Sequence, residues 1–98
     1  MLERDYQAAL IQKLKALFPG CVVLKNDSSY LQGIPDLLVL VGQKWAMLEV
    51  KASFFAGYQP NQEYYLDLLD DMSFAMMICP ENEEEVLREL QQALRVRR

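Results

Sequence analysis

A hairpin pattern in residues 33–53 constrains the fold more than any other segment of the sequence. Two apolar runs flank Gly42-Gln43, and a two-residue type II′ turn is expected there because glycine suits its first central position. Counting outward from this turn places Asp36 directly opposite Glu49, on the same face of the sheet.

A third charge is expected at this end of the hairpin. Lys51 shares the face of Glu49, because side chains alternate with period two along a strand. Two carboxylates and an ammonium group then converge, which suits a divalent cation. The alternative is an end that frays into water, with Lys51 neutralising the acidic pair. Residues 37–41 and 46–50 favour a site, because they are apolar on both faces and predict a strand pair covered on both sides.

Length and composition limit the class of protein. With 98 residues, of which 52% are hydrophobic, the chain is predicted to form one domain over residues 1–98. No apolar stretch approaches the ~20 residues of a membrane span, and the N-terminus has the pattern of a charged helix rather than a signal peptide. Cys21 and Cys79 lack metal-ligand spacing and there is no histidine, so zinc, haem and histidine catalysis are not expected. Reduced thiols in a cytoplasmic protein are expected.

The net charge of −4 argues at first sight against a nucleic-acid partner. A cation bound between Asp36 and Glu49 would neutralise part of this charge. The sequence is not that of a strongly basic DNA clamp, so a phosphate-binding function would need both a metal and a local basic rim. The basic residues concentrate in two places, early in the chain (Lys13, Lys15 and Lys25) and at its tail (Arg95, Arg97 and Arg98).

Helical periodicity flanks the hairpin on both sides. Apolar residues recur at helical spacing in residues 2–18 and in residues 60–71, where a proline suits the first turn. A last helix is expected to begin at Asn82, with Glu85 as its partner in a capping box.

Two short runs rich in β-forming residues, 21–25 and 74–79, are expected to add strands to the hairpin. The predicted order is αβββαβα, which is an α/β fold with a mixed central sheet flanked by helices. Because a helix connects the hairpin to the last strand, that strand is expected to run parallel to one of the hairpin strands.

The predicted helices carry polar residues near the charged end of the sheet. Glu3 and Gln7 lie one turn apart beside an apolar stripe, and either can point at the hairpin charges; an acidic residue stabilised by the helix dipole is the alternative for Glu3. Gln62 is expected on the buried face of its helix, as a residue of the site. The alternative is a semi-buried amide whose hydrogen bonds are satisfied within the fold. Lys25 and Ser53 are expected at the rim.

Pro35-Asp36, followed some dozen residues later by Glu49-Val50-Lys51, resembles the signature of the PD-(D/E)XK nucleases. The resemblance extends to the VRR-NUC branch and covers nearly the whole chain. Three segments carry it: Glu3 with Gln7 in the first helix, Gly33-Ile34-Pro35-Asp36-Leu37 as the G-x-PD-L core, and Pro60-Asn61-Gln62 with Tyr65-Leu66 as the glutamine-bearing helix.

The resemblance implies a restriction-endonuclease-like core and a small stand-alone VRR-NUC nuclease. It implies that Asp36, Glu49 and the Val50 carbonyl bind Mg²⁺ or Mn²⁺. Lys51 would orient the attacking water or stabilise the transition state.

Two further residues receive roles from the same resemblance. Glu3 would support a second metal or its waters, and Gln62 would position a water or a backbone phosphate.

By similarity to Holliday-junction resolvases, the resemblance also implies a homodimer that cuts branched DNA, such as a four-way junction, in a bacterial or phage-infected cell. Phe54, Phe55, Tyr58 and the tyrosines of the second helix are candidates for the dimer surface. One alternative is a non-catalytic nucleic-acid or protein-interaction module, which would be marked by loss of a charge from the site; all three charges are present. Another is a regulatory partner in a phage replication complex.

Overall fold

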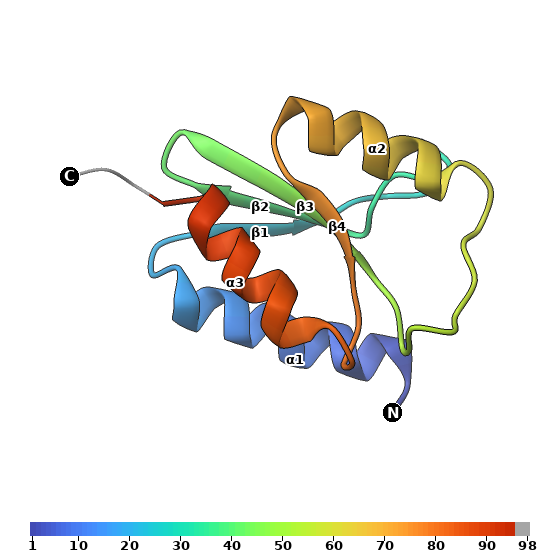
Figure 1. The fold of residues 1–98 in the computed structure, drawn as a ribbon, viewed down its shortest axis with the longest axis horizontal. Coiled ribbons are helices and arrows are strands. Elements are labelled where there is room, and N and C mark those ends of the chain that lie inside the picture. The colour runs from blue at the N-terminus through green and yellow to red at the C-terminus, as the bar shows by residue number, and fades with distance from the viewer. Residues whose placement is uncertain (96–98) are drawn as a thin grey trace.

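The computed structural model describes residues 1–95, and Figure 1 shows them as a sheet with helices on both sides. The strands are β1 (Val22–Lys25), β2 (Leu37–Val41), β3 (Lys44–Val50) and β4 (Ala75–Ile78), and the helices are α1 (Glu3–Leu17), α2 (Gln62–Met72) and α3 (Glu83–Ala93). This order confirms the predicted αβββαβα arrangement and the α/β class. No helix within these residues is long and apolar enough to cross a bilayer. Arg97 and Arg98 of the predicted basic tail lie outside the described residues.

The sheet has the strand order β1-β2-β3-β4, with β4 parallel to β3 and the other pairs antiparallel. Val41 pairs with Lys44 across the turn, which confirms the register predicted from the sequence. Gly42 has a φ of 60°, whereas Gln43 keeps a negative φ, as a type II′ turn requires. The parallel strand follows from its connection through α2, which returns the chain to the same end of the sheet.

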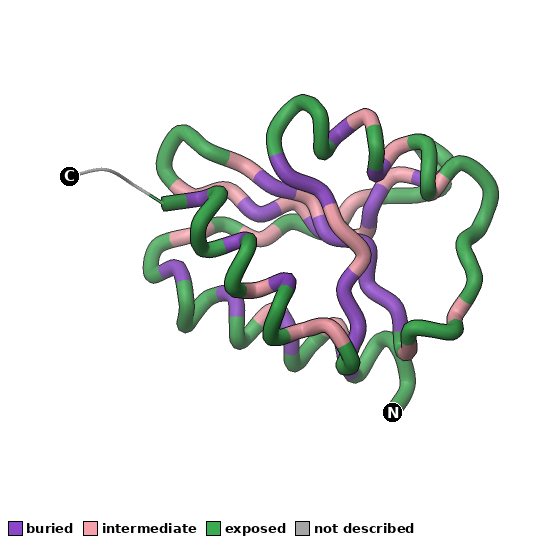
Figure 2. The backbone as a smooth tube through the Cα atoms, in the orientation of Figure 1, coloured by how far each residue is buried: buried purple, intermediate pink, exposed green. Residues whose placement is uncertain are grey.

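Helices cover both faces of the sheet. Leu48 and Val50 of β3 belong to a core shared with α1 and α3, whereas Trp45 and Met47 pack with α2. Glu49 lies two residues beyond Met47, so strand alternation puts it on the α2 face. In Figure 2 buried residues run along the central strands. The predicted cover on both sides holds for β3, whereas Leu38 and Leu40 of β2 are only half-buried on the α2 face.

Asn82 is the N-cap residue of α3, as predicted, but its side chain makes no capping hydrogen bond. The Oδ1 atom of Asn82 accepts a hydrogen bond from the Cys79 backbone N–H at 2.8 Å, and its Nδ2 atom donates to the Met77 carbonyl at 3.1 Å. The predicted capping box with Glu85 is therefore wrong, because the Asn82 amide is used to tie the end of β4 to the following turn.

A close backbone contact joins the loop before β2 to the start of α2. Gly33 has a φ of 93°, and a Cβ atom placed on it would lie 2.6 Å from the Asn61 Cβ and 2.7 Å from the Asn61 carbonyl carbon. Asn61 itself has a φ of 70°, so α2 begins at Gln62 and not at residue 60 as predicted. The contact fixes the segment that carries Asp36 relative to the first turn of α2.

We expect Gly33→Ala to lower the free energy of unfolding in urea by about 1–3 kcal/mol, because it adds a steric clash to an unfavourable φ. Gly20→Ala is the matched control, since Gly20 has a φ of 85° but nothing lies within 4 Å of its added Cβ. Equal losses in the two variants would show that the contact with Asn61 has no energetic role.

Candidate functional site

Asp36 and Glu49 meet where β2 begins and β3 ends. The Asp36 Oδ2 atom accepts a hydrogen bond from the Val50 backbone N–H at 2.8 Å, which ties the acidic side chain to the neighbouring strand. Glu49 is 2% exposed, in the face of β3 that α2 covers. The two carboxyl groups lie close enough that Asp36 contributes to raising the pKa of Glu49. The hairpin register therefore brings these residues together, as the sequence predicts.

Lys51 is also buried, with 6% of its surface exposed. Its Nζ atom lies 3.4 Å from Glu49 Oε2 and donates a hydrogen bond to Gln62 Oε1 at 2.9 Å. The same atom lies 5.7 Å from the centroid of the Tyr58 ring, within the range of a cation–π interaction. The ammonium group is thus held on three sides.

Gln62 connects the charged residues through its single amide. Its Nε2 atom donates to Glu49 Oε2 at 3.0 Å, while its Oε1 atom accepts from Lys51 and from the Gln59 backbone N–H at 2.7 Å. The sequence places Gln62 in the first turn of its helix, but it does not reveal the link to Gln59 or the ring of Tyr58. Both belong to the segment between the hairpin and α2, which has no periodic pattern.

The structure does not bring Glu3 to this cluster. Helix α1 lies on the opposite face of the sheet, where the Tyr6 hydroxyl donates to Glu83 Oε1 of α3 at 2.9 Å. Glu3 is exposed, Gln7 is half-buried, and neither makes a hydrogen bond or ion pair with the charged residues within the described part of the chain. The role expected for Glu3 at a second metal stays a prediction.

The two predicted rim residues lie outside the charged cluster. Lys25 is exposed at the end of β1, and the Ser53 Oγ atom accepts a hydrogen bond from the Phe55 backbone N–H at 3.3 Å. Val50 is buried, and its proposed carbonyl ligand role also stays a prediction.

The charged cluster has the donor chemistry of a divalent-cation site. Glu49 Oε1 is a buried oxygen without a hydrogen-bond partner among the described residues, whereas Glu49 Oε2 is used by Gln62 and Lys51. A buried anionic oxygen without a partner is costly, and a hard cation such as Mg²⁺ or Mn²⁺ satisfies such an oxygen. Within residues 1–95 no group of three or more His, Cys, Asp or Glu residues surrounds it. A cation held here by two carboxylates would complete its coordination with water and other oxygens, as Mg²⁺ usually does.

Burial is the main cause, and the charge of Asp36 the next, of a Glu49 pKa that is raised to about 8, while Lys51 opposes the rise. Without a cation, the raised pKa favours a proton on the Glu49 carboxyl group. A metal ion would have to displace that proton, so its binding is expected to strengthen as the pH increases.

A polar pocket of about 510 Å³ opens beside Asp36 and Gln62. Its lining residues include Ser28, Ser29 and Gln59, and within residues 1–95 no lysine or arginine lines it. These wall residues were not identified from the sequence, where they lie in unpatterned polar loops. Through this pocket Asp36 and Gln62 face the solvent. A groove of about 540 Å³ between α1 and α3 is slightly larger, but it contains none of the charged site residues.

Comparison of the chain with protein-family models, with curated proteins and with solved structures gives no match.

The raised pKa of Glu49 predicts how stability depends on pH. The protonated carboxyl group stabilises the folded state below pH 4.5, and this contribution is lost as the pH rises to about 8. Between pH 4.5 and 8 we expect the melting temperature of the metal-free wild type to fall by at least ~4 °C more than that of a Glu49→Gln variant, which has no carboxyl group to titrate at this position. Glu89→Gln, on the exposed face of α3, is the control, and its melting temperature should decrease with pH as much as that of the wild type. An identical pH dependence in Glu49→Gln and the wild type would contradict this assignment.

Proposed function

We propose that this chain is a metal-dependent endonuclease that hydrolyses phosphodiester bonds in DNA, with a restriction-endonuclease-like core of the VRR-NUC type. One observation carries the proposal: the buried Glu49 carboxyl group, with an unpartnered Oε1 atom, lies beside Lys51 and beside Asp36, which lines a pocket open to solvent. The order of the elements and the PD…EVK spacing support it.

The residues of the cluster have separate roles in this proposal. Asp36, Glu49 and the Val50 carbonyl would hold Mg²⁺ or Mn²⁺, which would supply charge stabilisation to the phosphodiester and acidify a water molecule. Gln62 fixes one Glu49 oxygen and leaves the other for the cation. The same amide holds Lys51 in position.

The proposed reaction is in-line attack by a water oxygen on phosphorus, with cleavage of one P–O ester bond. Lys51 would orient this water or compensate the negative charge that grows on the phosphoryl oxygens. Its ammonium group suits this role as a compact charge that needs no rearrangement, because Glu49, Gln62 and Tyr58 already surround it.

We also propose that the active form is a homodimer that acts on branched DNA such as a four-way junction. Each chain carries one charged cluster, and a symmetric cut in two strands needs two of them, which a two-fold dimer supplies. Phe54 and Phe55 are exposed in the loop before α2 and are available for such a contact. Static light scattering should give the mass of a dimer at micromolar concentration, and a monomer mass would count against this part of the proposal.

The direct test is cleavage of labelled four-way junction, flap and linear duplex DNA with Mg²⁺, Mn²⁺ or EDTA. We expect metal-dependent cutting that Lys51→Met reduces by about 10²–10³-fold, which is the usual effect of removing one charge-stabilising group. Lys15→Met is the control, because Lys15 is an exposed lysine of α1, on the opposite face of the sheet. Thermal melting of each variant separates loss of activity from loss of the fold.

Two results would count against the proposal. Wild-type rates in Lys51→Met would remove the lysine from the mechanism. A wild-type protein that cuts no substrate, and whose melting temperature Mg²⁺ and Mn²⁺ leave unchanged, would point instead to a non-catalytic binding module.

A further inference from the structure

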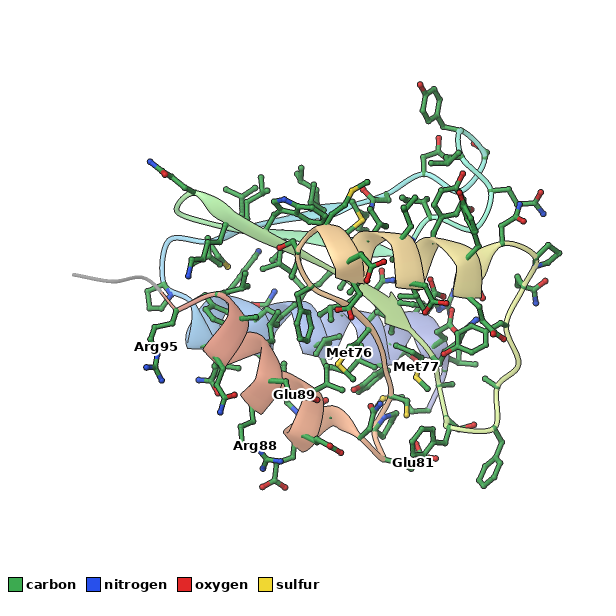
Figure 3. All side chains as sticks on the ribbon, turned by 45° about the horizontal axis from the view of Figure 1, so that its top comes forward. Met76, Met77, Glu81, Arg88, Glu89 and Arg95 are labelled. Carbon is green, nitrogen blue, oxygen red and sulfur yellow. The ribbon has the colours of Figure 1, made fainter. Side chains whose placement is uncertain are left out.

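The surroundings of the charged cluster are poor in accessible positive charge. Among residues 1–95 no lysine or arginine lines the polar pocket: Lys51 is buried, and the exposed Lys25 at the end of β1 is not one of the lining residues. Arg88 and Arg95 belong to the α3 side of the molecule, on the opposite face of the sheet from α2, as Figure 3 shows. Proteins that track a DNA duplex obtain most of their affinity from contacts between basic side chains and phosphates. Affinity near this site must therefore have another source.

A second pocket, of about 470 Å³, adjoins the first one and shares Gln59 with it. We name it the tyrosine pocket, and its lining residues are Tyr58, Gln59, Pro60, Asn61, Glu63 and Tyr64.

Both tyrosine rings of this pocket are held by other side chains and remain accessible. The Tyr64 ring packs edge-on against the Tyr65 ring, with centroids 5.1 Å apart and an interplanar angle of 79°, and it is 62% exposed. The Tyr58 ring lies by the Lys51 ammonium group and is 42% exposed. Held aromatic rings at a solvent-accessible pocket are what a flat aromatic ligand needs for stacking.

The charge of the tyrosine pocket selects against a phosphate. Glu63 lines it, and after burial the negative charge of Glu63 is the largest contribution to the raised pKa of Tyr58. A neutral nucleobase avoids this repulsion. Its exocyclic amino group can donate to a carboxylate such as that of Glu63, and its face can stack on a tyrosine.

We propose, resting on the nuclease function proposed above, that the tyrosine pocket binds an unpaired nucleobase adjacent to the scissile phosphate. Gln59 joins the two pockets, so a base in one and the phosphate in the other belong to neighbouring positions of a single strand. A base within an intact duplex is stacked and paired, and it must leave the helix before it can enter. The site therefore favours DNA with unpaired nucleotides at the point of cleavage over continuous duplex.

Binding of a short labelled single strand, measured by fluorescence anisotropy in EDTA, tests this inference without cleavage. We expect Tyr64→Ala to weaken binding about 10-fold, because stacking on one aromatic ring contributes on the order of 1–3 kcal/mol per base. Tyr64→Phe should keep the wild-type affinity, since it keeps the ring. Tyr30→Ala is the control, because Tyr30 is 90% exposed but lies outside the tyrosine pocket. Weak binding of linear duplex should be the same in all four proteins.

A strand that lacks one base beside the cleavage position gives the sharper comparison. The wild type and Tyr64→Ala should bind this strand equally, because the group that occupies the pocket is missing. In cleavage assays with metal, Tyr64→Ala should raise KM about 10-fold for the intact strand and leave kcat unchanged.

The inference and the proposed function fail in different ways. If the wild type cuts DNA with metal but Tyr64→Ala binds the single strand as tightly as the wild type, the base pocket is wrong and the nuclease stands. If affinity falls in Tyr64→Ala while the wild type neither cuts DNA nor gains stability from Mg²⁺ or Mn²⁺, the pocket stands as a base-binding site and the nuclease is wrong.

Discussion

The burial of the Glu49 carboxyl group at the end of β3 is the constraint on which the rest of the site depends. A carboxylate inside a protein loses its hydration and must be compensated by neighbouring charges, hydrogen bonds or a proton. Here Lys51 and Gln62 compensate one of its oxygens and leave the other without a partner. An arrangement built only for stability would satisfy both oxygens or replace the group with an apolar one. The unequal treatment of the two oxygens is the strongest physical reason to look for a ligand.

The groups that surround the Glu49 carboxyl group come from the hairpin and from α2. Asp36 reaches across to the Val50 N–H, which holds the first strand against the second, and α2 supplies Gln62 from the other direction. The Gly33 backbone packs against Asn61 immediately before that helix. The position of the glutamine amide is therefore set by a backbone contact and does not depend on the flexible side chain alone.

The sequence was sufficient to predict the features of the fold that depend on short-range rules. The glycine of the turn determined the hairpin register, and apolar periodicity determined the number and order of the elements. It was insufficient where contacts join distant segments. No local sequence pattern indicates that the Tyr58 ring lies by Lys51, or that the Asn82 side chain accepts a hydrogen bond from the Cys79 backbone after β4. The face on which α1 packs is likewise a property of the whole core, so spacing alone could not predict that Glu3 lies away from the charged cluster.

The Gln62 amide contacts three parts of the chain at once: the end of β3, the following Lys51, and the Gln59 backbone of the loop that leads into α2. Such a cluster has no counterpart in a partly folded chain. A peptide that forms only the hairpin contains the three charges but neither the amide nor the tyrosine ring that hold the lysine. Assembly of the site is consequently cooperative with completion of the fold, and local unfolding of the loop before α2 dismantles the site while the sheet remains intact.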